Sequence, residues 1–139
     1  MAPDEVDDDE PLWRCAHPSF LEREEDALRA NSGAFISAGE VFISVFRGAY
    51  ASLEIVRNAF PATFSVAQVL ARDARAVGFT IITSPAEAGI DEAHADLYPP
   101  EGTGKKALRR MASALGRRSI LVYVCPLSLI EFGLGLDPI

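Results

Sequence analysis

The segment at 105–124 constrains the fold more than any other part of the chain. Residues 105–116 carry apolar side chains at three- and four-residue steps, at Leu108, Met111, Ala112 and Leu115. This spacing predicts an amphipathic helix that ends at Gly116. The next run, SILVYV at 119–124, is rich in β-branched residues and predicts a strand. Because the helix stripe and the strand must each be buried against another layer, this succession predicts helices packed on a sheet.

Shorter patterns of both kinds fill the rest of the chain. Strand-like runs occur at 12–15, 41–46, 79–83 and 94–98. Helix-like patterns occur at 52–60, capped by Ser52, and at 65–77, followed by Gly78 as a C-terminal stop. Because these elements do not alternate strictly as strand and helix, we expect an α+β fold. Its sheet should be mixed or antiparallel, with about four to five strands and about three helices packed on it.

Several segments have a less definite pattern. Residues 20–30, after the possible cap Ser19, fit either a polar helix or an ordered excursion. The NSGAF segment at 31–35 has the residue types of a tight turn. The apolar tail at 125–139 fits an edge strand or a segment that lies over the core. Residues 1–11 are acidic with almost nothing apolar to bury, so we expect them to be disordered and 12–139 to form a single domain.

Length and composition limit the class of protein. The 139 residues suit one globular domain, and no apolar run approaches the ~18 residues of a membrane span. The acidic N-terminus has no basic or apolar region of a secretory signal. We therefore expect a cytoplasmic protein without membrane association, in which Cys15 and Cys125 are reduced core residues.

The net charge of −7 is unevenly distributed along the chain. Residues 1–26 sum to −8, whereas residues 102–139 sum to +4. The basic residues Lys105, Lys106, Arg109 and Arg110 begin the helix described above and predict a surface for an anion or an acidic partner. Their partner could also be the chain's own acidic N-terminus. Overall acidity argues against general binding to a nucleic-acid backbone, which depends on summed positive potential.

The same basic stretch is not a phosphate-binding loop. In GTGKK the glycine and lysine at 104–105 fit the end of the G-x-x-x-x-G-K-S/T pattern, but Pro99 stands where the first glycine belongs. Lys106 replaces the hydroxyl residue that would bind magnesium. The stretch therefore predicts a proline-glycine turn that leads into a helix.

Four polar residues at strand ends and turns are candidates for ligand binding: Arg14, His17, Ser32 and His94. An arginine can hold a phosphate while a serine and a histidine hydrogen-bond around it. The alternative is a structural network. Two further arrangements use the cysteines: a zinc site from Cys15, His17, His94 and Cys125, and a nucleophilic pair of one cysteine with His94. Because Cys-x-His is not a standard metal spacing and buried thiols are usually inert, we expect no metal and no cofactor.

The motifs around these residues resemble those of a group of small bacterial proteins of unassigned function. The shared features are an Arg-x-x-His-Pro start, a Ser-x-x-Phe turn before a strand, and a late His-Ala segment. They correspond here to Arg14, His17, Ser32, Phe35 and His94. The arginine on a first strand and the serine before a second also resemble ADP-ribosyltransferase-like folds. That resemblance implies a late catalytic glutamate, for which Glu131 is the candidate.

The chain contains no complete catalytic motif, so we favour a non-enzymatic role. The expected function is that of a small bacterial accessory domain that acts through a protein partner. An ADP-ribosyltransferase-like enzyme or nucleotide-binding domain that uses Arg14, Ser32 and His94 is the alternative. Nucleic-acid binding through the basic helix at 105–118 is a further one.

Overall fold

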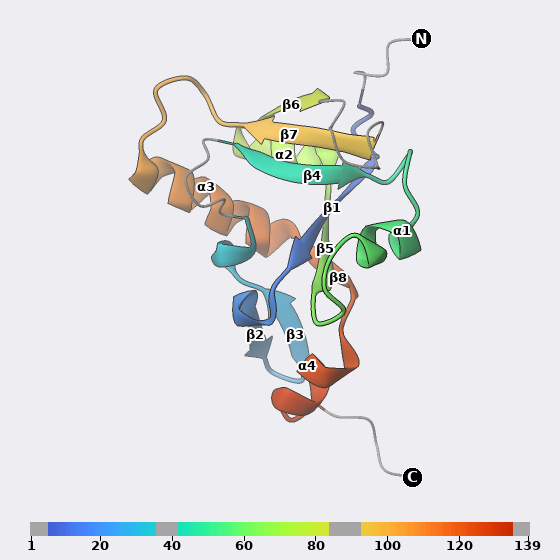
Figure 1. The fold of residues 1–139 in the computed structure, drawn as a ribbon. Helices are drawn as coiled ribbons and strands as arrows, with labels where there is room; N and C mark the ends of the chain where they lie inside the picture. Colours follow the sequence, from blue (N-terminus) through green and yellow to red (C-terminus); the bar gives the residue numbers. More distant parts are fainter. Residues whose placement is uncertain (1–5, 36–41, 84–92, 135–139) are drawn as a thin grey trace.

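A computed structural model of the chain describes residues 6–35, 42–83 and 93–134. At its centre is a six-stranded sheet with the strand order β6-β7-β4-β1-β5-β8, in which all neighbours pair antiparallel. A separate two-stranded hairpin and four α-helices complete the described parts (Figure 1). The expected α+β class is confirmed. The sheet has one strand more than the expected upper number, and one more helix is present than expected.

The strands of the main sheet are β1 (Pro11–Ala16), β4 (Ile43–Arg47), β5 (Ser65–Leu70), β6 (Thr80–Thr83), β7 (His94–Tyr98) and β8 (Ile120–Tyr123). All but β5 coincide with strand-like runs of the sequence. Alternation in β4 is clear, because Ile43, Val45 and Arg47 are buried while the residues between them are half-buried. Both faces of the sheet therefore carry packed side chains.

Residues 65–77 form a strand and then a helix, so the single helix expected there is wrong. β5 ends at Leu70, and α2 (Ala71–Val77) follows directly. The adjacent residues Val66 and Ala67 are both buried, because β5 lies inside the sheet with apolar clusters on either face. A strand buried on both faces loses its alternation, and its apolar spacing then imitates a helix. Gly78 ends α2 as expected, with a φ of 120°.

Residues 20–30 contain no α-helix, although a polar helix was one expectation. They form the hairpin of β2 (Leu21–Glu24) and β3 (Ala27–Ala30). Its two-residue turn places Glu25 at a φ of 57°, which is uncommon for a residue other than glycine. The Arg23 Nε atom donates a hydrogen bond of 2.8 Å to the Glu25 carbonyl and holds this turn in place.

The helices cover the sheet on both sides. α2 and α3 (Lys105–Arg118) contribute Ala74, Ala112 and Leu115 to the larger apolar cluster on one face. α1 (Leu53–Asn58) contributes Val56 to a smaller cluster on the other face. Ser52 caps α1 as expected, accepting a 3.2 Å hydrogen bond from the Ile55 N–H.

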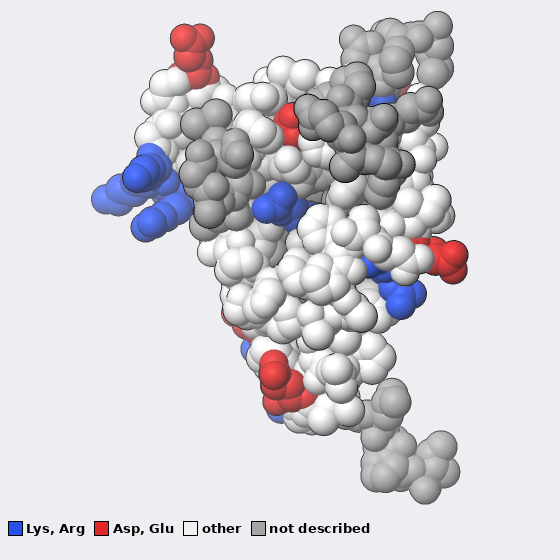
Figure 2. Space-filling model, viewed as in Figure 1, with Lys and Arg blue, Asp and Glu red and all other residues white. Residues whose placement is uncertain are grey.

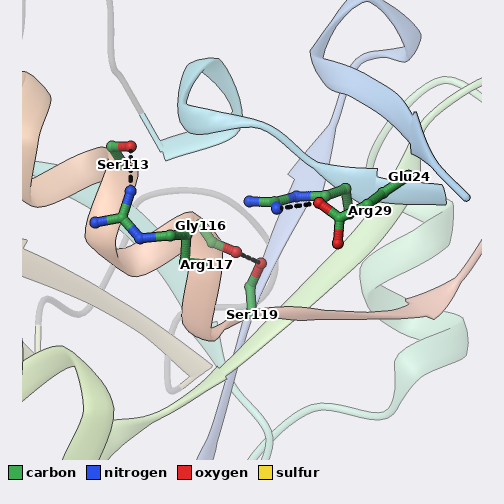
Figure 3. A network of polar contacts seen from close by, with 6 residues as sticks. All are labelled: Glu24, Arg29, Ser113, Gly116, Arg117 and Ser119. Carbon is green, nitrogen blue, oxygen red and sulfur yellow. Dashed lines mark hydrogen bonds and ion pairs between the residues drawn. The ribbon is translucent and has the colours of Figure 1, made fainter.

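The C-terminal turn of α3 lies beside the end of the hairpin, at Ala30 and Asn31 (Figure 3). The helix extends two residues beyond its expected end at Gly116, which is buried against the backbone of Ala30 and Asn31. Ser119 Oγ donates 2.7 Å to the Gly116 carbonyl. In the same view Arg117 contacts Ser113 at 3.0 Å and Arg29 pairs with Glu24 at 2.7 Å. A Cβ at position 116 would lie 3.6 Å from the Asn31 backbone, an ordinary contact distance, so the packing here does not require a glycine.

Residues 6–10 are packed against the domain, so the expectation of a disordered lead-in is wrong for this part of it. The Asp8 and Glu10 carbonyls accept hydrogen bonds from the first amides of α2, at 2.9 and 3.0 Å. These amides have no partner within the helix, and acidic side chains favour a helix N-terminus. Val6 is buried, and Glu10 forms a buried ion pair with Arg47. Residues 1–5 lie outside the described residues.

Within its described part the apolar tail forms no edge strand, but Phe132 packs against the larger apolar cluster, so the tail lies partly over the core. Residues 126–131 are a short helix, α4 (Pro126–Glu131), on which Leu127 and Ile130 are 65% and 61% exposed. Residues 135–139 of the tail lie outside the described residues.

Candidate ligand-binding site

The site begins where β1 separates from β4. β1 pairs with β5 along its whole length, but with β4 only at Leu12 and Trp13. Beyond this point the Arg14 side chain joins the separated segments. Its Nε donates 2.8 Å to the Ala34 carbonyl, and its Nη1 donates 2.8 Å to the Ser44 carbonyl on β4. Arg14 therefore replaces strand pairing with side-chain hydrogen bonds and keeps the two strands apart.

Burial lowers the pKa of Arg14 from its ordinary value. The cost of desolvating the charge exceeds the effect of the neighbouring Cys15 thiol on this pKa. Because Arg14 binds two backbone carbonyls, its role here is to support the wall of a cavity. The sequence had suggested instead that it binds a phosphate directly.

A cavity of about 590 Å³ opens at this separation. Its walls come from β1, β4, β7, the 3-10 helices η1 (Pro18–Phe20) and η2 (Ser32–Phe35), and the connection between α1 and β5. The lining residues are Arg14, Cys15, His17, Ser19, Phe20, Ala34, Ser44, Phe46, Phe60, Phe64 and His94. Three of the four candidate residues, Arg14, His17 and His94, thus meet at one place.

Ser32 is not among the described residues that line the cavity. It begins η2, the turn expected at NSGAF, and only Ala34 of that turn reaches the wall. The Asn31 side chain shapes the turn by accepting a 2.8 Å hydrogen bond from the Gly33 N–H. Ser32 is therefore close in the chain to the site without forming its surface.

Aromatic rings form a continuous series of contacts along the cavity. The centroid distances are 6.2 Å for Phe20–His17, 5.4 Å for His17–Phe64, 5.6 Å for Phe64–Phe60, 6.0 Å for Phe60–Phe46 and 6.2 Å for Phe46–His94. Most of these contacts are edge-to-face, the arrangement that aromatic quadrupoles favour. A histidine lies near each end of the series. The cavity is thus mainly aromatic, with polar groups at its margins.

The two histidines have different polar partners. His17 Nδ1 accepts a 3.1 Å hydrogen bond from the Ser19 N–H, so a neutral ring carries its proton on Nε2. His94 Nε2 lies 3.9 Å from Asp96 Oδ1, and the same carboxylate oxygen accepts a 3.2 Å hydrogen bond from Ser44 Oγ. His94 is therefore held between β7 and β4 on the cavity side.

Cys15 lines the cavity but is not activated as a nucleophile. Burial raises the pKa of the Cys15 thiol to about 11, an effect that the nearby Arg14 charge only partly offsets. The Sγ atom donates a weak hydrogen bond of 3.8 Å to the Val56 carbonyl. At neutral pH the residue is a thiol, whereas a nucleophilic cysteine requires a thiolate. This geometry does not support the Cys–His pair considered from the sequence.

The other catalytic and metal-binding arrangements are not assembled at the cavity. Glu131 ends α4 and is not one of the described lining residues. Cys125 is buried elsewhere, where its N–H donates 3.0 Å to Ser65 Oγ. Within the described ranges, no group of three or more His, Cys, Asp or Glu side chains is placed to hold a metal ion.

Lys and Arg side chains gather over the beginning of α3 (Figure 2). The four expected residues, Lys105, Lys106, Arg109 and Arg110, are all exposed there. None of them forms an ion pair with an acid among the residues the structure describes. The described N-terminal acids pair instead with Arg47, Arg72 and Arg75. The chain's own described acids therefore do not neutralise this surface, which we call the α3 basic surface.

Comparison of the chain with protein-family models, with curated proteins and with solved structures finds no significant match. None of the described helices combines the length and apolar character needed to cross a bilayer. The chemistry of the cavity is therefore the basis for assigning a function.

The four phenylalanines of the cavity were not recognised in the sequence as site residues. Phe60 and Phe64 flank Pro61 in NAFPATF, a segment between a helix and a strand. This connection forms no helix or strand that could bury the two aromatic side chains. Their presence there is a signal that could have identified this wall of the cavity.

Proposed function

We propose that the cavity beside β1 binds a small molecule with a flat aromatic or heteroaromatic body. The observation that carries this proposal is the series of six rings lining a space of about 590 Å³. Ligand cavities commonly measure ~300–1,000 Å³ and combine apolar walls with a few polar groups. Aromatic walls stack favourably on flat rings, whereas an aliphatic wall has no such preference.

The polar groups at the margins would orient such a ligand. His17 can offer its Nε2–H as a donor, and Ser19 offers a hydroxyl that also contacts His17 Nδ1 at 2.8 Å. His94 supplies a second imidazole near the other end of the ring series. This retains Arg14 and His94 from the nucleotide-binding hypothesis, but it gives Arg14 a supporting role, omits Ser32 and adds His17.

The test is binding of phenylnaphthylamine, a neutral aromatic dye whose fluorescence rises in an apolar site. We expect the wild-type protein to bind one dye molecule, and Phe60→Ala to weaken binding about tenfold because a stacking wall is lost. Phe42→Ala is the matched control, since Phe42 contacts Tyr98 outside the cavity lining. Bound dye should also slow alkylation of Cys15. The proposal is wrong if the dye does not bind, or if both variants bind it as tightly as the wild type.

A second function is favoured by the α3 basic surface. We propose that the domain also acts as an accessory protein that binds an acidic protein partner there. The four exposed cations have no described acidic partner, so a partner's carboxylates would not have to displace an existing ion pair. Both cysteines of the domain are free thiols, which suits the cytoplasmic location that we propose for the protein and its partner.

Retention on immobilised polyglutamate tests this second function. We expect Lys105→Gln combined with Arg109→Gln to elute at clearly lower salt than the wild type, because two of four surface cations are lost. Arg117→Gln combined with Arg118→Gln is the control with equal charge at the other end of α3. Equal elution of both double variants would contradict the proposal, and stronger retention on DNA than on polyglutamate would favour nucleic acid instead.

A further inference from the structure

A second, smaller hollow adjoins the aromatic cavity. Its volume is about 160 Å³, and its lining residues are Arg57, Asn58, Phe60, Pro61, Ala62, Phe64 and Tyr123. Phe60 and Phe64 line both spaces, so their rings form the boundary between them. These rings are 5.6 Å apart at an angle of 31°. The two spaces therefore lie on either side of the same pair of rings, so one ligand that reaches around Phe60 would contact both.

The chemistry of the smaller hollow differs from that of the cavity. Arg57 lies in the last turn of α1, with its guanidinium carbon 3.7 Å from the centre of the Tyr123 ring. This stacking positions the guanidinium without using an N–H donor. The structure records no hydrogen bond or ion pair from the Arg57 side chain to another described residue, including Glu54 one turn earlier. Asn58 adds an amide at the same place.

We propose that the ligand is an aromatic anion, whose flat body occupies the cavity and whose phosphate or carboxylate group binds Arg57 in the smaller hollow. This rests on the proposed binding function of the cavity. A guanidinium that is fixed by stacking and keeps its donors available matches the planar geometry of such anionic groups. The site would then select its ligand twice, by ring stacking in the cavity and by charge beside it.

A pair of dyes separates the two parts of this site. Anilinonaphthalene sulfonate is phenylnaphthylamine with an added sulfonate, so the ratio of their Kd values measures the contribution of the charge. We expect Arg57→Gln to weaken sulfonate binding about three- to fivefold, as for one partly exposed ion pair, and to leave phenylnaphthylamine binding unchanged. Arg57→Lys should recover part of the loss, because it restores the charge without the planar donors. Added salt should weaken sulfonate binding only.

The control is Arg109→Gln, which removes an exposed arginine on α3, away from both spaces. Thermal unfolding of each variant identifies a loss caused by misfolding. If phenylnaphthylamine does not bind, the aromatic cavity itself is refuted. If it binds while Arg57→Gln and Arg109→Gln change sulfonate binding equally, only the anion site is refuted.

Displacement of the bound sulfonate dye identifies the natural chemistry. Adenosine monophosphate tests an aromatic phosphate and naphthoate tests an aromatic carboxylate, each compared with its uncharged counterpart, adenosine or naphthalene. Stronger displacement by one charged compound than by its neutral counterpart assigns that class. Displacement by neither charged compound would overturn the proposal.

Discussion

Loss of the buried ion pair between Glu10 and Arg47 should destabilise the domain strongly. Both Glu10 oxygens are engaged, Oε2 with Arg47 Nε at 2.8 Å and Oε1 with Nη2 at 2.8 Å. The two side chains are only 7% and 2% exposed. Hydrogen bonding of the Arg47 guanidinium to the Glu10 carboxylate is the main reason that the pKa of Arg47 is raised. The substitution Glu10→Gln removes the negative charge while nearly preserving the shape of the side chain.

The magnitude follows from burial. Removing one partner of a buried ion pair leaves the other charge uncompensated, which costs ~3–5 kcal/mol. A domain of this size has ~5–15 kcal/mol of stability in total. At roughly 3–5 °C for each kcal/mol, the melting temperature should fall by ~10–20 °C. Replacing both residues by methionine should be far less harmful, because no isolated charge then remains.

Urea unfolding followed by the fluorescence of Trp13, the only tryptophan, measures these effects. Asp9→Asn is the internal control, because its 2.9 Å ion pair with Arg72 is exposed and should contribute less than ~1 kcal/mol. The reasoning fails if Glu10→Gln costs no more than Asp9→Asn. It also fails if the double methionine variant is as unstable as Glu10→Gln.

Four smaller tests address other parts of the structure. Because burial raises the pKa of Cys15 to about 11, the rate of its alkylation by iodoacetamide should rise about tenfold per pH unit up to that pH. Mass spectrometry of the alkylated protein measures this rate, and a rate that levels off near pH 9.0, the ordinary pKa, would contradict the expectation. Gly48→Ala should cost ~1–3 kcal/mol, since its new Cβ would lie 2.5 Å from Pro11 Cγ. Gly116→Ala should instead raise the stability by ~0.5–1 kcal/mol through its helix propensity, because no atom lies nearer than 3.6 Å to the added Cβ. Equal changes in the free energy of urea unfolding for the two glycine variants would contradict this difference. Ser52→Ala should lower stability by ~1 kcal/mol while Ser52→Asn preserves the cap, as thermal unfolding can show.

The sequence was most informative where a segment has one buried face. The stripe of α3 and the alternation around Val45 both show a period that only one secondary structure satisfies. β5 is buried on both sides, and the periodicity that distinguishes strand from helix is lost there. The hairpin was obscured for a different reason. Its glutamates favour a helix, but the pairing that determines its conformation joins buried Leu21 to buried Ala30, a tertiary effect.

The candidate site could be predicted only in its polar part. Arg14, His17 and His94 were noticeable as polar groups beside apolar strands, and they line one cavity. Which of their atoms remain available was not predictable, because the carbonyls that bind Arg14 come from η2 and β4. The partners of the N-terminal acids could not be predicted from the sequence either. From the sequence alone, a run of acids predicts mutual repulsion and disorder. In the fold, the start of α2 and Arg47 lie beside these acids and bind them.

The central position of β1 determines the order in which this protein can be completed during synthesis. β1 is the earliest described strand, yet it lies between β4 and β5 and pairs with residues as late as Leu70. No neighbouring hairpin can secure it early, because its nearest partner in the chain, β4, joins it at only two positions. Contacts between distant parts of a chain form slowly, since a long loop must first close. The cavity wall formed by Arg14 and Cys15 can therefore form only after about half of the chain, as far as β5, has been synthesised.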